Sequence, residues 1–170
     1  DKEFCKKYMG QSPVIAITLK DVAGNDFESA YLKLAEVVSY KAIEFSFLKD
    51  SPYLDELEKA KFNKLCDEDY LKNADKKAIS YVTSAIKSLS QMLYKHFNKQ
   101  VYVLIDEYDV PLAKAQSYGY HKDMVTLMSS FLGFLKDSQK DPETNKPVVK
   151  KVILTGCLKV AKNSIFTGVN

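Results

Sequence analysis

The chain has 170 residues, 46% of them hydrophobic, and a formal net charge of +3. That length suits one domain with a sizeable core, and we expect neither a membrane span nor a secretory signal. All 25 basic residues are lysine, so the arginine forks that read nucleic acid are missing, and no nucleic-acid partner is indicated. The three widely spaced cysteines predict neither a disulfide framework nor a zinc site, and a reducing, cytoplasmic location is expected.

The first half of the chain predicts one strand followed by helices. Residues 14–19 form a short apolar run of strand length. Apolar side chains then recur at intervals of three and four, which predicts amphipathic helices at residues 27–45 and 79–97, and a more charged helical piece is expected between them at residues 53–66. Asn98 is the expected stop of the last of these helices.

The second half predicts two further strands around one helix. Residues 101–106 form an apolar run that we interpret as a strand buried on both faces. A loop at residues 117–120 and a helix at residues 124–135 follow, and then a polar connector at residues 140–150. The last apolar run, at residues 151–155, ends in a hydroxyl.

Alternating strands and helices are typical of right-handed crossover units. The sequence therefore predicts an α/β protein of one domain, with three α/β/α layers and a parallel sheet whose strands lie near residues 14–19, 101–106 and 151–155.

The most informative segment runs from Val101 to Asp109, where a buried strand leads into the carboxylates of Asp106, Glu107 and Asp109. In open α/β sheets, ligands bind beyond the carboxyl ends of the strands. Successive strand residues point to opposite faces, so one carboxylate could hold hydrated Mg²⁺ while the other polarises a water, as phosphoryl transfer requires. The alternative is that the strand simply ends in solvated acids.

Three segments together resemble the prokaryotic AAA-ATPase-like family of P-loop proteins. They are residues 103–112, 154–156 and 161–170. Residues 13–19 match the family's second strand more loosely, and residues 50–73 are the weakest stretch. Members commonly carry a restriction-endonuclease-like domain after the ATPase part.

The resemblance implies roles for several residues. Asp106 would be the Walker B carboxylate that helps hold Mg²⁺, and Glu107 the base or water-orienting residue. Thr155 would be the polar sensor of the γ-phosphate, although its hydroxyl could equally satisfy local backbone groups. Asp109 and Asn170 belong to the family pattern without an assigned chemistry, and Asp109 is expected to bond its own backbone in a turn.

The chain departs from the family pattern at two points. None of its six glycines is followed by lysine, so the Walker A loop that cradles phosphates is missing. We therefore interpret residues 1–170 as an internal portion of an AAA-ATPase-like domain that binds neither ATP nor Mg²⁺ tightly by itself. Lys159 stands where the family usually has arginine, and lysine cannot make the bidentate contact.

The leading hypothesis is the central part of a Mg²⁺-dependent ATPase domain that carries the Walker B and sensor strands and is inactive alone. One alternative is a degenerate, non-hydrolysing α/β module for protein interaction. Another is a free-standing Mg²⁺-dependent enzyme that uses Asp106, Glu107 and Asp109. Without the strand that carries the phosphate loop, residues 151–156 become a sheet edge, and we expect self-association there.

Overall fold

The computed structural model describes residues 2–135, 140–141 and 144–157. Within them, no helix is long and apolar enough to cross a membrane. The strands are β1 (Val14–Thr18), β2 (Val101–Asp106) and β3 (Val149–Leu154). The helices are α1 (Lys2–Tyr8), α2 (Phe27–Glu44), α3 (Glu56–Cys66), α4 (Glu68–Lys72), α5 (Lys76–Thr83), α6 (Ala85–Phe97), α7 (Val110–Tyr118) and α8 (His121–Phe131), with short 3-10 helices η1 (Ser46–Asp50) and η2 (Gly133–Leu135).

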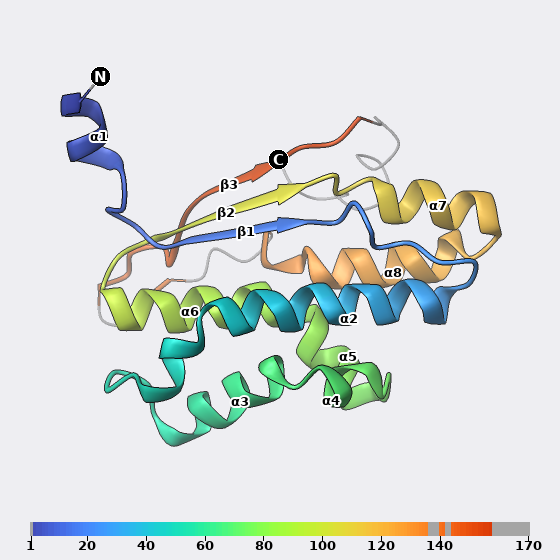
Figure 1. Cartoon of the computed structure of the whole chain (residues 1–170), viewed down its shortest axis with the longest axis horizontal. Helices are drawn as coiled ribbons and strands as arrows, with labels where there is room; N and C mark the ends of the chain where they lie inside the picture. The colour runs from blue at the N-terminus through green and yellow to red at the C-terminus, as the bar shows by residue number, and fades with distance from the viewer. Residues whose placement is uncertain (1, 136–139, 142–143, 158–170) are drawn as a thin grey trace.

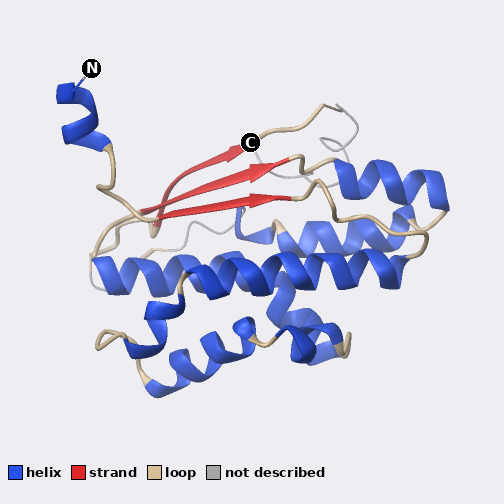
Figure 2. Cartoon of the chain, viewed as in Figure 1, coloured by secondary structure: helices blue, strands red, loops and turns tan. Residues whose placement is uncertain are grey.

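The three strands form one parallel sheet in the order β1-β2-β3 (Figures 1 and 2). Thr18 of β1 lies opposite Asp106 of β2, and Ile105 lies opposite Leu154 of β3. The register shifts between Val101 and Tyr102, where β3 joins the sheet. The predicted strands are confirmed, and β3 begins earlier than the predicted residue 151.

Helices flank the sheet in layers (Figure 1). Helix α2 contacts β1 and helix α6 contacts β2, whereas α3 and α4 lie on the other side of α2, away from the sheet. Helix α8 packs against α5 and α7. Helix α2 begins where the Asp26 carboxylate accepts a hydrogen bond from Ser29 N at 2.7 Å, and its buried stripe includes Tyr31 and Leu34. The structure is consistent with the predicted three-layer α/β fold.

The two faces of the sheet are covered unequally. Val101, Val103 and Ile105 of β2 are buried, whereas Leu104 is only partly buried and Ala16 of β1 is exposed. The prediction that β2 is buried on both faces is therefore wrong for the described residues. An apolar run shows that a strand is hydrophobic, but it does not show whether a helix lies over each face.

The single helix predicted at residues 79–97 is two helices, α5 and α6, which meet at Ser84. The hydroxyls of Thr83 and Ser84 donate to the carbonyls of Ile79 and Ser80 at 2.9 and 2.7 Å, and such bonds bend helices. The predicted stop at Asn98 is confirmed, since this residue has a left-handed backbone with φ of 50°.

Three helices were not predicted, namely α1, α4 and α7. Helix α7 starts directly after the acidic segment, with Pro111 in its first turn, and the left-handed Gly119 ends it at φ of 85°. The predicted loop at residues 117–120 is thus partly the end of a helix. Lys159 and the family-like segment 161–170, including Asn170, lie outside the described residues.

In the described part of the chain, β3 pairs only with β2, which makes it an edge strand. Thr155 N donates to Ile105 O of β2. Successive residues of a strand direct their backbone N–H groups to alternate sides, so the N–H groups of Val152 and Leu154 point away from β2. Ile153 is 43% exposed on the open face, and Lys150 and Lys151 are exposed too. We expect the chain to associate with itself through residues 151–156 or to aggregate.

Light scattering across a concentration series and amide exchange at Val152 and Leu154 would test this self-association. Ile153→Lys should disperse the chain, whereas Tyr118→Lys, at a residue of similar exposure on α7, should not. A stable wild-type monomer with slow exchange at both amides would contradict the expectation.

Candidate functional site

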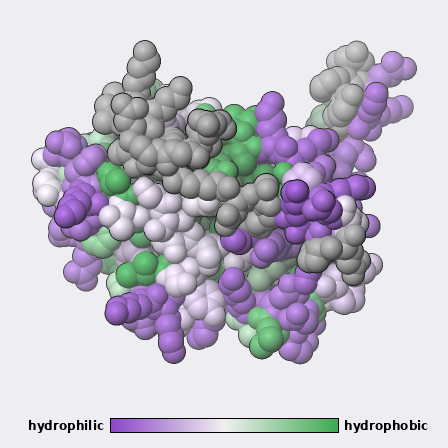
Figure 3. Space-filling model, turned by 180° about the vertical axis from the view of Figure 1, so that it is seen from behind, coloured by the Kyte–Doolittle hydropathy of each residue, from purple (hydrophilic) through white to green (hydrophobic). Residues whose placement is uncertain are grey.

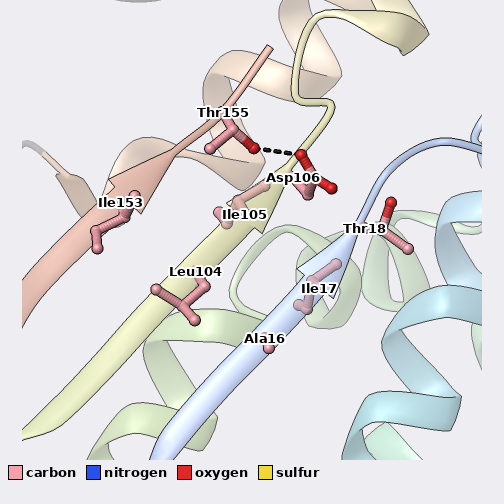
Figure 4. A pocket seen from close by; sticks show the side chains of 8 residues that line it. All are labelled: Ala16, Ile17, Thr18, Leu104, Ile105, Asp106, Ile153 and Thr155. Atoms are coloured by element: carbon pink, nitrogen blue, oxygen red, sulfur yellow. Dashed lines mark hydrogen bonds between the residues drawn. The ribbon is translucent and has the colours of Figure 1, made fainter.

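Polar residues lie side by side where the three strands end: Thr18 and Asp106 are the last residues of β1 and β2, and Thr155 directly follows β3 (Figure 4). Leu19 N donates to the carbonyl of Asp106, and Thr155 N donates to the carbonyl of Ile105, both at 2.9 Å. The parallel ladder therefore brings these side chains to the carboxyl edge of the sheet, where α/β proteins bind ligands.

Asp106 is held through one of its two carboxylate oxygens. Oδ1 accepts a hydrogen bond from Glu107 N at 3.0 Å and another from the hydroxyl of Thr155. No described residue donates to Oδ2, and the side chain is exposed. The carboxylate is thus fixed in orientation while Oδ2 stays open to a cation or to water.

Glu107 lies in a turn, not in the strand. Strand β2 ends at Asp106, and Glu107 has a left-handed backbone with φ of 54°. Its carbonyl accepts a hydrogen bond from Val110 N at 3.1 Å. Glu107 is therefore not a strand residue as predicted, and the strand alternation does not set the direction of its side chain relative to that of Asp106.

Asp109 does not bond its own backbone as predicted. Its Oδ2 accepts a hydrogen bond from Cys157 N at 3.0 Å, which links the segment after β2 to the segment after β3. Nearby, Tyr108 N donates to the carbonyl of Thr155 at 3.2 Å. Burial, and then the charge of Asp109, raise the pKa of the Tyr108 phenol.

An open groove of about 520 Å³ leads along the sheet to this edge. Ala16, Leu104 and Ile153 line its apolar length, and Asp106 and Thr155 lie at its polar end (Figure 4). Seen from behind, hydrophobic surface appears between hydrophilic side chains at the level of the sheet (Figure 3). The groove offers apolar contact beside a polar tip, as small-molecule sites commonly do.

The acids do not form a metal cage. Among the described residues, no group of three or more His, Cys, Asp or Glu side chains is placed to hold a metal ion. Asp106, Glu107 and Asp109 therefore do not converge, which leaves the free-standing Mg²⁺ enzyme without support. Mg²⁺ usually keeps several waters and takes one or two carboxylates plus substrate phosphates, so Asp106 alone fits this mode of binding.

Two residues of the site were not singled out from the sequence. Thr18 lies one residue before the end of the apolar run at residues 14–19, and Thr155 ends the run at residues 151–155, so a hydroxyl near the end of both runs could have identified Thr18. Gly156 gave no such signal, because its closeness to Asp109 depends on tertiary packing. His96 hydrogen-bonds Ser51 Oγ at 2.9 Å and lies among aromatic rings.

No curated protein and no solved structure matches the chain. A family model does, and its description is "Predicted AAA-ATPase". The match covers residues 2–166 and so includes the three described strands and the polar residues Thr18, Asp106 and Thr155 at their ends. The chain belongs to the AAA-ATPase-like family.

Proposed function

We propose that this chain supplies the Walker B and sensor strands of a Mg²⁺-dependent ATPase site. Membership of a predicted AAA-ATPase family supports an ATPase-like role. The observation that carries the proposal is the arrangement of Asp106, which ends the central one of the described strands. Its Oδ1 is bonded to Thr155 of the neighbouring segment, and no described residue donates to its Oδ2.

Asp106 Oδ2 is the atom proposed to hold Mg²⁺, directly or through water. When bound, Mg²⁺ would neutralise charge on the β- and γ-phosphates of ATP. The bonds from Glu107 N and Thr155 keep the carboxylate oriented before the ion arrives, so less freedom is lost on binding.

Glu107 is proposed to orient the attacking water or accept its proton. The turn at Glu107 takes this side chain out of the strand alternation, so its position is set separately from that of Asp106. Thr155 is the proposed sensor. Its hydroxyl carries one hydrogen, which it gives either to Asp106 or to a phosphate oxygen, so phosphate binding would exchange one acceptor for the other.

The phosphate cradle would come from outside these 170 residues, because no glycine in the chain is followed by lysine. The second candidate function is a non-hydrolysing module for protein interaction. One observation favours it, namely the edge strand β3 with the exposed Ile153.

The chain alone should bind Mg²⁺-ATP more weakly than micromolar and show no turnover. Backbone donors and the lysine of a phosphate loop normally offset the desolvation of phosphate, and the chain has no such loop. Calorimetry with Mg²⁺-ATP and a phosphate-release assay would measure both quantities. Binding at micromolar level or tighter would place the nucleotide site elsewhere.

In the full-length protein, Glu107→Gln should lower turnover by a factor of roughly 100 or more while nucleotide binding stays nearly unchanged. Asp106→Asn should first raise the Mg²⁺ concentration needed for activity. Glu56→Gln is the matched control, since it neutralises an exposed acid on α3, far from the strand tips (Figure 1). Full turnover in both site variants would favour the interaction module.

A further inference from the structure

We infer that Asp109 is a positioning residue of this site. Its carboxylate holds the residues after β3 against the residues after β2, and so keeps the Thr155 hydroxyl on Asp106. The inference rests on the proposed function of the strand tips. It concerns a residue for which the sequence suggested only a local turn.

Asp109 is only 4% exposed and is the one charged side chain in the buried set of the described residues. A carboxylate loses its hydration when it is buried, and it is retained only where hydrogen bonds replace the lost water. Oδ2 accepts such a bond from Cys157 N at 3.0 Å. The bond therefore joins two segments that are far apart in sequence.

The side chain of Asp109 does not cap the helix that it precedes. Asp26, Asp55 and Asp75 precede α2, α3 and α5 with extended backbones, and each accepts a hydrogen bond from its own first turn. Asp109 occupies the same position before α7, yet its backbone is helical, with φ of −89° and ψ of −17°, and its side chain makes no capping bond. Its carboxylate reaches across to the β3 segment instead.

Gly156 lets the two segments approach closely. A Cβ atom at this residue would lie 2.5 Å from Asp109 Oδ1 and 2.9 Å from Tyr108 Cε1, so no side chain fits there without displacing one of them. Tyr108 N bonds the carbonyl of Thr155, and Asp109 Oδ2 bonds Cys157 N. Hydrogen bonds at Thr155 and Cys157 thus hold the segment 155–157, with Gly156 close to Asp109 between them.

Thr155 depends on this arrangement because β3 ends one residue earlier, at Leu154. Beyond that residue, Ile105 O still accepts a hydrogen bond from Thr155 N, and the contacts of Tyr108 and Asp109 then set the direction of the backbone. A fixed backbone lets the Thr155 hydroxyl rotate from Asp106 to a phosphate without moving the segment. Asp109 therefore acts through Thr155 and contacts neither substrate nor metal in this proposal.

The test compares Asp109→Ala and Asp109→Asn with Asp26→Ala, which removes another aspartate from a helix start away from the strand tips. In this chain carrying Ile153→Lys to keep it dispersed, and without nucleotide, Asp109→Ala should speed amide exchange at Cys157 about tenfold or more. It should also let the Thr155 side chain rotate, so that the couplings of this side chain measured by NMR become averages over several rotamers. Asp109→Asn keeps an acceptor oxygen and should restore most of both signals, whereas Asp26→Ala should change neither.

In the full-length protein, Asp109→Ala should lower kcat about tenfold while KM for Mg²⁺-ATP changes less than about twofold. Unchanged exchange at Cys157 and unchanged Thr155 couplings would overturn the inference. So would an equal loss of kcat in Asp109→Ala and Asp26→Ala, since the role would then be structural only.

Two further outcomes are covered by the same design. If the wild-type protein hydrolyses no ATP, the proposed function fails, yet the exchange and coupling data still decide the positioning role. If Asp109→Ala does not fold, Gly156→Ala replaces it, because its methyl group would displace Asp109 Oδ1 and should loosen Cys157 and Thr155 in the same way.

Discussion

The central position of β2 is the constraint on which the rest of the structure depends. This strand pairs in parallel on both sides, and Val101, Val103 and Ile105 are buried against the helices. Burying each such side chain contributes about 1.5–3 kcal/mol. A slip of one residue would turn all three toward the open face, so burial fixes the register. The register in turn decides that Asp106 emerges at the carboxyl edge beside Thr18.

The site is assembled from three segments that meet only in the folded chain. The sheet brings the strand tips to within hydrogen-bonding distance, but the ladder ends at Asp106 and Leu154. Beyond those residues, the Asp109 carboxylate and the Thr155 hydroxyl tie the two segments together, along with the backbone bond from Tyr108 N to Thr155 O. The geometry proposed for metal and phosphate contacts therefore depends on these few polar bonds as well as on the core.

The sequence predicted the strands and helices whose burial repeats regularly along the chain. Apolar runs placed the strands, and a stripe at helical spacing placed α2, since burial repeats with the period of the element. Features set by single polar side chains could not be predicted in this way. The break at Ser84 follows from hydroxyls that bond the preceding turn, and the left-handed turn at Glu107 has no signature in residue type. Asp109 was placed correctly but given the wrong partner, because Cys157 approaches only through the tertiary fold.

The local structure of the tip bears on the choice between an ATPase part and an interaction module. A left-handed backbone at Glu107 costs about 1–2 kcal/mol of folding free energy. Because the side chain of Asp109 does not cap α7, this helix also lacks the stabilisation of about 1 kcal/mol that a cap provides. A scaffold that serves only for protein contact has no need of either feature, since glycine at residue 107 would relieve the strain without changing the sheet. Strained residues concentrate at functional sites, where surrounding contacts hold them in place. Ala74 also has a left-handed backbone, at φ of 54°, away from the strand tips, so strain alone does not mark a site. The combination of a strained Glu107 and an uncapped α7 within three residues of Asp106 is what favours the ATPase part.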